Sequence, residues 1–447
     1  MQIDRIELKN YRGFEDCIID FHPNINVFIG SNASGKTTIL KSIVKSIYSL
    51  TSQFVASSES SKELTLSEDD INYKSEFLTI RSTISNFPNY SKKIELRIEE
   101  GILNDDILSR KTYFENEKRD FRMWFNNSIK TTIPEIPIIK FYPANRGSIS
   151  YVNRSRNALL HTTQMETWAN IYQDEISYSS FFQWFFENET SELRLQRNSN
   201  DFGIESPKLK NVRTALYKAF EKLNFGNYIL LSEQIERKGS SKLIPTLVLR
   251  NRDSGQEEIL DNLSEGQKAI IILIADIAYN LSLSNNFDTN SNFLDSEGIV
   301  IIDEVETHLH PRWQREILPI LLDVFPKIQF FVATHSPQII SSVESQNVFI
   351  CDNFQVNHVN LKTKGEDTNS LLKHIFDASE RPKPYIKLIN KFNTLIETNA
   401  DYKSIEKVIE EVKELYNQDK ANSISNLIDE LNIKLSAYQF EKEYDKD

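Results

Sequence analysis

One stretch of the sequence has the residue types and spacing that bind the phosphates of a nucleotide, "GSNASGKTT" at residues 30–38. The pattern G-x-x-x-x-G-K-[ST] is met by Gly30, Gly35, Lys36 and Thr37, between an apolar stretch and a helical pattern. In such a loop, backbone N–H groups wrap the phosphates, the lysine reaches the terminal phosphates and the hydroxyl ligates magnesium. A chance Gly/Ser-rich turn is the weaker alternative. We expect ATP and Mg²⁺ to bind at Gly30, Ser31, Asn32, Ala33, Ser34, Gly35, Lys36, Thr37 and Thr38.

A second stretch with catalytic residue types is "GIVIIDEVETHLHP", which ends at Pro311. Its apolar residues 299–302 predict a buried strand, and Asp303 and Glu304 follow this strand directly. Ligands of open α/β sheets lie at the carboxyl ends of strands, so both carboxylates are expected to face the nucleotide. We expect Asp303 to hold Mg²⁺ and Glu304 to orient or deprotonate the attacking water. The alternative is that the two acids only cap the helix that begins near Pro311.

A histidine follows a further expected strand, in "IQFFVATHSP", where His335 stands at the carboxyl end. A single histidine is usually a structural residue whose hydrogen bonds are satisfied. His335, however, follows the Asp303–Glu304 strand at the distance that one crossover helix requires. We therefore expect His335 to contact the terminal phosphate as a hydrogen-bonding switch.

A second polar turn before a helix, "LSEGQ", occurs much later in the chain, at residues 263–267. Ser264 is expected to be the N-cap of the apolar helix "GQKAIIILIADIAYN". The N-terminus of this helix can receive a phosphate group, through Ser264, Gly266 and Gln267. The alternative is a capped helix that binds no ligand. One bound nucleotide needs only one phosphate loop, which raises the question of which nucleotide the second motif serves.

Strands and helices are expected on both sides of these motifs. Residues 18–29 predict a strand, a turn and the strand before the phosphate loop, and "FLTIRSTIS" and "KKIELRIEE" predict two more strands. Two strands within "YILLSEQIERKGSSKLIPTLVLRN" lead to the LSEGQ helix. After His335, two short strands precede three segments whose apolar residues recur at helical spacing, which predicts three amphipathic helices. Docking onto the rest of the chain and binding of a partner are both compatible with these helices.

Residues 177–197 are dense in aromatic side chains. These aromatics could bind a base or a partner, but the core of a helical insert is the favoured interpretation. The residues concerned are Phe181, Trp184 and Phe185 of this range, together with Trp168 before it.

The composition is that of a globular protein, with 447 residues, 39% hydrophobic and 26% charged. A net charge of −12 does not suit a protein whose whole surface coats nucleic acid, so nucleic acid would contact a local groove or come through a partner. The two cysteines, Cys17 and Cys351, have no metal-like or disulfide-like spacing, which fits a reducing cytosol. No signal peptide is recognised and no window approaches the ~18–20 apolar residues of a membrane span. We expect a cytoplasmic protein without a membrane partner.

Together, these motifs resemble those of the SMC/RecF-type branch of ABC ATPases. The opening "IDRIELKNYRGFEDCIIDFHPNINVFIGSNASGKTT" is similar to that branch's N-terminus, and "LSEGQ", "IIDEVETHLHP" and "ATHSP" complete the set. "THLHP" with "THSP" is typical of bacterial members without long coiled coils, and no sustained heptads occur here. The resemblance implies the fold class α/β, an ABC-type P-loop ATPase head with a mixed sheet and flanking helices. It also implies that Arg12 lies near the nucleotide.

In that family, the signature motif serves the nucleotide bound to another subunit. The resemblance therefore implies that two chains sandwich two ATP molecules, each between the Lys36 loop of one chain and the Ser264 helix of the other. One copy of each motif per chain makes a homodimer with an isologous interface the simplest working unit, and a higher even-numbered oligomer contains the same pairing. Hydrolysis would release the subunits, and members of this branch can use bound ATP mainly as a switch with slow turnover.

The sequence departs from the family pattern at the Q-loop. No clear glutamine follows a strand in the first lobe, and the nearest candidate region is "IPIIKFYPANRG", with Tyr142 and Arg146. This departure and the opening "LKNYRGF" count against a third class, the ATPase subunit of a transporter.

The motifs divide the chain into four expected parts. Residues 1–150 form an ATPase lobe with the phosphate loop, and 151–225 a helical insertion. Residues 226–362 form the lobe with the signature, the Asp303–Glu304 pair and His335. Residues 363–447 form a C-terminal α-helical module for a partner or for oligomerisation. The acidic motifs of a TOPRIM nuclease domain, which OLD-family nucleases carry after a similar ATPase, do not follow His335.

Over the whole chain, the sequence resembles the PtuA-type ATPases of Septu and retron-linked antiphage systems, with "FFQWF" in the insert and "ASERPKPYIKLINKF" in the tail. The resemblance implies an ATPase that binds a separate HNH nuclease of the PtuB type. In the retron version, it implies a reverse transcriptase and its multicopy single-stranded DNA as further partners. ATP would then hold or release a nuclease effector during infection. The alternative is a RecF-like ATP-dependent DNA-binding clamp in DNA repair.

Overall fold

The computed structural model describes most of the chain, in two compact units, Met1–Leu371 and Leu372–Asp447. The described residues are 1–52, 54, 64–103, 107–114, 118–131, 135–144, 166–169, 171, 178–236, 243–285, 293–375, 383–419 and 422–444. Arg146 lies outside them, so its expected place after a strand is not described.

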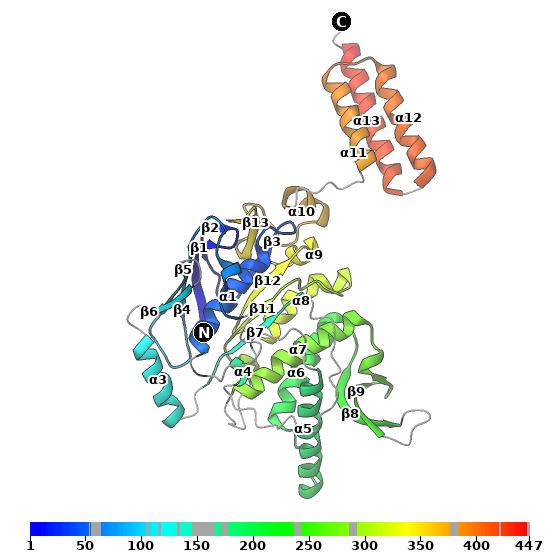
Figure 1. Cartoon of the computed structure of the whole chain (residues 1–447). Coiled ribbons are helices and arrows are strands. Elements are labelled where there is room, and N and C mark those ends of the chain that lie inside the picture. Colours follow the sequence, from blue (N-terminus) through cyan, green and yellow to red (C-terminus); the bar gives the residue numbers. More distant parts are fainter. Residues whose placement is uncertain are drawn as a thin grey trace. The chain divides into compact units, whose positions relative to one another are not determined.

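The centre of the first unit is a six-stranded sheet with parallel inner strands (Figure 1). Its order is β14-β13-β3-β12-β11-β7, and only the edge strand β14 is antiparallel to its neighbour. Every residue of β3, β7, β11 and β12 is buried, which explains their mainly apolar sequences. The polar exceptions include Asn26, Lys140 and Gln329. The strands are β3 (Ile25–Ile29), β7 (Ile138–Tyr142), β11 (Gly298–Ile302), β12 (Ile328–Thr334), β13 (Val348–Asp352) and β14 (Gln355–His358).

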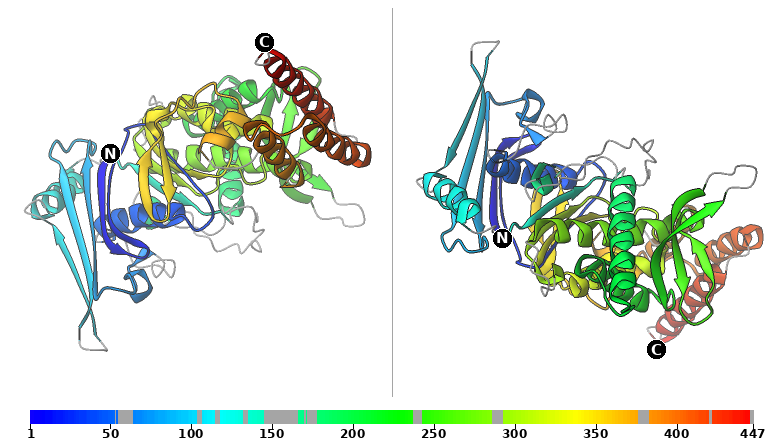
Figure 2. Two further views of the ribbon diagram at one scale, coloured as in Figure 1. Left: turned by 90° about the horizontal axis from the view of Figure 1, so that it is seen from above. Right: turned by 90° about the horizontal axis from the view of Figure 1, so that it is seen from below.

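A second sheet, antiparallel throughout, lies along one side of the first unit (Figure 2). Its order is β2-β1-β4-β5-β6, and α1 (Lys36–Thr51) packs against β12 of the first sheet and against β4 and β5 of the second. A helix between two sheets is buried on nearly all sides, as α1 is. The strands are β1 (Gln2–Tyr11), β2 (Phe14–Asp20), β4 (Phe77–Ser85), β5 (Ile94–Leu103) and β6 (Ile107–Phe114).

Helices cover the remainder of the first unit, together with a three-stranded sheet, β10-β9-β8. The long helix α5 (Tyr178–Ser199) packs on α6, α7 and β8. Its Phe181 and Trp184 contact Tyr279 of α7, with ring centroids 6.1 and 4.9 Å apart. The other elements are α3 (Lys118–Thr131), α4 (Glu166–Ala169), α6 (Pro207–Leu223), β8 (Tyr228–Glu236), β9 (Leu243–Asn251), β10 (Glu257–Ile259), α7 (Glu265–Ser284), α8 (Pro311–Val324), α9 (Pro337–Ile340) and α10 (Thr368–Ile375).

The aromatic residues of the expected insert are core residues. Trp168 and Phe185 are completely buried, and Phe181 and Trp184 are buried nearly as deeply. Trp168 stacks on Phe125 of α3, with ring centroids 5.3 Å apart. This confirms the packing interpretation and leaves these rings no exposed face for a base.

The second unit contains the three amphipathic helices that the sequence predicts, α11 (Lys383–Glu397), α12 (Tyr402–Asp419) and α13 (Asn422–Tyr444). Their apolar residues form a core of their own around Phe392, which is completely buried. The boundary between the two units falls within α10. The mixed sheet with flanking helices and the helical C-terminal unit confirm the predicted fold class.

The helix α7 corrects one expectation about membranes. Its 20 residues are long and apolar enough to cross a membrane by length and composition, whereas no segment of that kind was expected. However, 78% of its apolar window is buried within the unit. The apolar sequence of α7 is therefore explained by its packing against α5, α6 and β7.

Candidate functional site

Three loops of the candidate site leave the six-stranded sheet at the same edge. The phosphate loop follows β3, His335 follows β12, and Asp303 and Glu304 follow β11. The register pairs Ile29 with Thr334 and Ile302 with Val332, so the carboxyl ends of these neighbouring strands are level. The order β3-β12-β11 thus brings together residues that are about three hundred positions apart in the sequence.

The phosphate loop has a backbone that only glycine can adopt at two positions. Gly30 and Gly35 have φ angles of 151° and 107°. A Cβ at Gly30 would collide with the carbonyl oxygen of Cys351, and one at Gly35 would lie 2.7 Å from the ring of Phe14. The turn between β13 and β14 supports the loop from outside, because the N–H of Phe354 donates to the carbonyl of Ser34 over 3.3 Å.

The loop also contains an unsatisfied polar atom. The Oγ of Ser34 is buried and has no hydrogen-bond partner among the described residues. Gly35 is the N-cap of α1 and makes no side-chain cap, so the N–H groups of the first helical turn point out of the helix end. A buried hydroxyl and a helix N-terminus at one loop fit a phosphate group. Ser31, Asn32 and Ala33 form the exposed outer part of this loop, and Thr38 is half-buried in the first turn of α1.

Lys36 folds back over the phosphate loop. Its Nζ donates to the carbonyl oxygens of Gly30 and Ser31 over 3.0 and 2.8 Å. Burial lowers the pKa of Lys36, while nearby carboxylates, including Asp303 and Glu304, act in the opposite direction. The ammonium group is therefore close to the carboxylates that follow β11. The carbonyl oxygens that accept its hydrogen bonds can be replaced by phosphate oxygens.

Thr37 and Asp303 are in direct contact. The Thr37 Oγ1 donates to the Asp303 Oδ2 over 2.7 Å, and the N–H of Asp303 donates to the carbonyl of Tyr142 over 2.8 Å. A hydroxyl and a carboxylate oxygen at this separation are two ligands of the kind that Mg²⁺ takes beside phosphate oxygens and water. No group of three or more His, Cys, Asp or Glu side chains in the described part of the chain could hold a metal alone.

Glu304 has a left-handed backbone, with a φ angle of 48°. Such a conformation costs a residue with a side chain about 1–3 kcal/mol and is found preferentially at functional sites. The Thr307 Oγ1 lies 3.5 Å from the Glu304 Oε2. The turn moves Glu304 out of the direction of β11, so that its carboxylate is near Lys36 and His335.

His335 is held by a residue that the sequence interpretation missed, Glu306. The Glu306 carboxylate accepts from the N–H of His335 over 2.5 Å and from the Thr334 Oγ1 over 2.7 Å. Burial, followed by the charge of Lys36, lowers the pKa of His335, so the imidazole is neutral at pH 7. The only sequence signal for Glu306 was its place two residues after Glu304, which gave no indication of a bond to the next strand.

The signature residues occupy a different helix end. Ser264 caps α7, and its Oγ and N–H both bond to the Gln267 Oε1, over 2.8 and 3.0 Å. This confirms the predicted N-cap and adds a capping box. Ser264 is exposed and Gln267 is half-buried, whereas Gly266 is buried against the loop after Glu304: a Cβ there would lie 2.5 Å from the carbonyl oxygen of His308. The described hydrogen bonds of the Ser264 and Gln267 side chains stay within this cap and do not reach the phosphate loop.

Arg12 stands in the turn between β1 and β2, beside the glycine that packs on Phe354. Its Nε donates to the Asp70 Oδ1 over 2.8 Å, and Lys45 of α1 bonds to the other oxygen of the same carboxylate. Asp70 is completely buried and these two cations help to hold its pKa below the usual value despite the burial. The structure thus joins Arg12 to α1 through Asp70.

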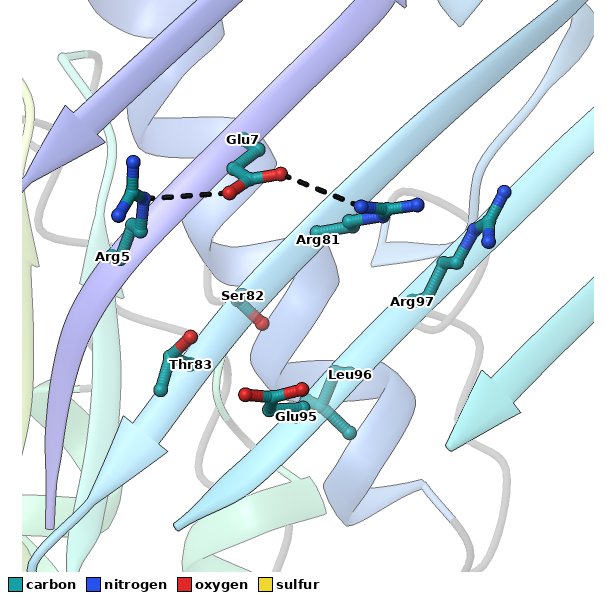
Figure 3. A pocket seen from close by; sticks show the side chains of 8 residues that line it. All are labelled: Arg5, Glu7, Arg81, Ser82, Thr83, Glu95, Leu96 and Arg97. Atoms are coloured by element: carbon teal, nitrogen blue, oxygen red, sulfur yellow. Dashed lines mark ion pairs between the residues drawn. The ribbon is translucent and has the colours of Figure 1, made fainter. Parts of the chain in front are cut away.

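A surface pocket of about 120 Å³ lies on the antiparallel sheet and is lined by residues of β1, β4 and β5 (Figure 3). Arg5 and Arg81 approach the two oxygens of Glu7, at 3.4 and 3.8 Å. Three arginines and two glutamates line the pocket, and these charges largely neutralise one another. The pocket is therefore a solvent-exposed array of ion pairs, each of small energetic value.

Comparison with known proteins gives the family of the chain. A family model described as "AAA domain, putative AbiEii toxin, Type IV TA system" matches residues 25–341. The chain is 27% identical over 446 residues to the Retron Ec83 probable ATPase of Escherichia coli, across 89% of this chain and 80% of that protein. It is 23% identical over 454 residues to the Septu protein PtuA of Bacillus thuringiensis, across 98% of both.

Among solved structures, the Smc head bound to the C-winged helix domain of ScpA is similar with a TM-score of 0.46 and 13% identity, over 81% of this chain and 98% of that one. The two relatives confirm the resemblance to retron and Septu ATPases that the motifs indicated. The family model covers most of the chain, from the strand before the phosphate loop to the residues after His335. The chain therefore belongs to this AAA domain family and is a nucleotide-binding ATPase.

Proposed function

We propose that this ATPase is an ATP-driven switch of antiphage defence, which dimerises around ATP and regulates a separate HNH nuclease of the PtuB type. The names of the retron and Septu relatives support the defence role. The observation that carries the dimer is the signature cap: α7 presents an exposed, capped N-terminus whose side chains bond to each other and not to the chain's own phosphate loop. A second chain is the simplest source of a nucleotide for that helix end.

In the proposed reaction, a water oxygen attacks the γ-phosphorus of ATP and the bond to the β–γ bridging oxygen breaks, which releases ADP and phosphate. Glu304 orients the water and accepts its proton. Lys36 stabilises the charge on the phosphate oxygens, and neutral His335 donates a hydrogen bond to the γ-phosphate. Mg²⁺, held by Thr37 and Asp303, would neutralise charge on the β- and γ-phosphates.

The two ATP molecules of the proposed homodimer lie between the Gly30–Thr38 loop of one chain and Ser264, Gly266 and Gln267 of the other. Arg12 is proposed to stand beside the nucleotide. Higher even-numbered oligomers repeat this pair. The assembly is proposed to be cytoplasmic, to include a reverse transcriptase and multicopy single-stranded DNA in a retron version, and to contact nucleic acid directly or through these partners.

The four-part division of the chain is retained within this proposal. The lobes 1–150 and 226–362 supply the two halves of the ATP site, with 151–225 as the helical insertion. Residues 363–447 are proposed to bind the nuclease or to hold the oligomer together. The separate apolar core of Leu372–Asp447 supports this role, because a unit with its own core does not need the ATPase lobes to cover it.

The test is to express the chain with its native gene neighbours and to weigh the purified complex by native mass spectrometry, with and without ATP. We expect a small nuclease bound to an even number of these chains, with a composition that changes when ATP is added. Lys36→Ala is the matched control, because it removes the phosphate contact and should make the composition independent of ATP. A chain that runs alone and dimerises only with ATP and DNA would instead support the RecF-like clamp.

A further inference from the structure

Tyr142 joins two parts of the site that are far apart in the sequence. It is the last residue of β7 and is buried, with 3% of its surface exposed. Its carbonyl oxygen accepts from the N–H of Asp303 over 2.8 Å, and its hydroxyl donates to the Asp276 Oδ2 over 2.7 Å. Asp276 lies on α7, the helix that begins at the signature. A single residue therefore contacts both the magnesium-site segment and the signature helix.

The link to Asp276 is firmly held. Asp276 and Lys140 are each almost completely buried, and the Lys140 Nζ lies 4.0 Å from the Asp276 Oδ2. A hydrogen bond to a buried carboxylate is stronger than one between neutral groups and is costly to break. Lys140 and Tyr142 both belong to β7, so the carboxylate on α7 is fixed to this strand by two side chains.

The N-terminal end of α7 has a second contact with the same segment. Gly266 packs so closely on the loop after Glu304 that an added Cβ would lie 2.5 Å from the carbonyl oxygen of His308 and 3.2 Å from the ring of Trp313. Gly266 and Asp276 are about 15 Å apart along a helix with a rise of about 1.5 Å per residue. A helix held at two such points cannot rotate or slide without moving the segment that carries Asp303 and Glu304.

We propose that Tyr142 and Asp276 are positioning residues that transmit the state of a chain's own ATP site to its signature helix, and so to the ATP of the partner. Binding of ATP and metal would hold Asp303 in place, and the bond from the Asp303 N–H to the Tyr142 carbonyl would then hold the end of β7. The bond from the Tyr142 hydroxyl to Asp276 would in turn hold α7 and its Ser264 cap. This rests on the proposed function, in which the Ser264 cap serves the other chain's nucleotide. Tyr142 stands in the segment where the family's Q-loop glutamine is missing.

The first test is Tyr142→Phe in the full-length protein. The ring and the carbonyl bond to Asp303 remain, so the KM for ATP should stay within about two-fold, while kcat falls about ten-fold as the hydrogen bond to a charged group is lost. The matched control is Tyr438→Phe, which removes a comparable hydroxyl bond, to the carbonyl of Ala400 over 2.9 Å, in the C-terminal unit. The control should keep its kcat.

The second test separates an effect on the signature from an effect on the chain's own metal site. Heterodimers are purified with two affinity tags, and one chain carries Glu304→Gln, which leaves a single live ATP site in each dimer. The live site then takes its phosphate loop from one chain and its signature from the other. The reference is wild type paired with Glu304→Gln.

With Tyr142→Phe on the chain that supplies the live phosphate loop, turnover should stay within about two-fold of the reference, because the signature comes from an intact chain. With Tyr142→Phe on the Glu304→Gln chain, turnover should fall about ten-fold. The reverse pattern, or equal turnover in both heterodimers, would overturn the proposal. Failure of the proposed sandwich is detected separately: Ser264→Arg on the Glu304→Gln chain should stop turnover, and full activity of that heterodimer would mean that the signature does not act across subunits.

Discussion

Glu304 stands at a point where the backbone is strained, with a φ angle of 48°. Its positive φ angle ends β11 abruptly, while Asp303, one residue earlier, still bonds to Tyr142 of the neighbouring strand. Two adjacent carboxylates therefore have different surroundings. Asp303 bonds to the Thr37 hydroxyl, and Glu304 lies near Lys36 and His335. This separation supports the proposed roles, in which Asp303 holds the metal and Glu304 orients the water.

The prediction for Glu304 is that Glu304→Gln keeps the binding of ATP and slows its hydrolysis. The amide has the shape of the carboxylate but cannot accept a proton, so kcat should fall about 10²–10⁴-fold. Phosphate release and binding of a fluorescent ATP analogue measure the two quantities. Glu258→Gln, a change at an exposed position of β10, is the control and should leave both unchanged. Undiminished phosphate release by Glu304→Gln would remove this residue from the role of base.

The prediction for His335 concerns pH. Because burial lowers its pKa, the folded state binds fewer protons at this position than the unfolded state does below about pH 6.5. The neutral His335 side chain therefore makes its full contribution to the free energy of unfolding above about pH 6.5. That contribution is lost as the pH falls towards the depressed pKa of His335. Denaturant unfolding between pH 5 and 8 should show a smaller loss at low pH for His335→Gln than for wild type. His374→Gln, at an exposed position of α10, should follow the wild-type curve.

At the scale of elements, the close approach of α7 to the loop after β11 depends on one glycine. Gly266→Ala places a methyl group 2.5 Å from the carbonyl oxygen of His308, which belongs to rigid backbone. We expect a loss of about 1–3 kcal/mol in the free energy of unfolding, because packed segments must separate, and a marked loss of ATP turnover. Urea unfolding and phosphate release measure the two effects.

The matched control for this change is Gly203→Ala. Its added Cβ would lie 3.2 Å from the Asp201 side chain, at an exposed position where that side chain can move. The control should change stability by less than about 0.5 kcal/mol. If Gly266→Ala behaved like the control, the contact between the signature and the His308 loop would not be a constraint on α7.

At the scale of the whole molecule, the two units have separate cores, which makes the role of the C-terminal unit testable. Phe392→Ala removes a completely buried ring from the centre of that unit and should lower its stability by about 3–5 kcal/mol. Because α11 to α13 form a core of their own, ATP turnover should stay within about two-fold. Hydrogen exchange measured by mass spectrometry, followed unit by unit, and phosphate release check this outcome.

The control for this change is Phe440→Ala, the loss of the same ring from a position of α13 that is 64% exposed. It should leave hydrogen exchange in both units close to wild type. A collapse of ATP turnover in Phe392→Ala would show that the helical unit supports the ATPase, by packing on its own ATPase unit or by holding the oligomer together. Native mass spectrometry of the variant separates these two outcomes, because only the loss of an oligomer contact changes the number of chains in the assembly.

The sequence by itself determined the class of the fold and the residues of the candidate site. The phosphate loop, the Asp303–Glu304 pair and the Ser264 cap are local patterns, in which a few consecutive residues set the backbone and the functional groups. Apolar stretches before the phosphate loop and before the Asp303–Glu304 pair predicted buried strands. The carboxyl ends of parallel strands share one edge of a sheet.

Only the tertiary structure decided which of these motifs touch. The bonds of Tyr142 to Asp276, of Glu306 to His335 and of the Cys351–Phe354 turn to the phosphate loop depend on the strand order β13-β3-β12-β11-β7 and its register. Strand order depends on how the helices and sheets pack together, which involves residues far apart in the sequence. A short stretch of sequence therefore does not determine it. The physical link between the Asp303 segment and the signature helix therefore appears only when the chain is folded.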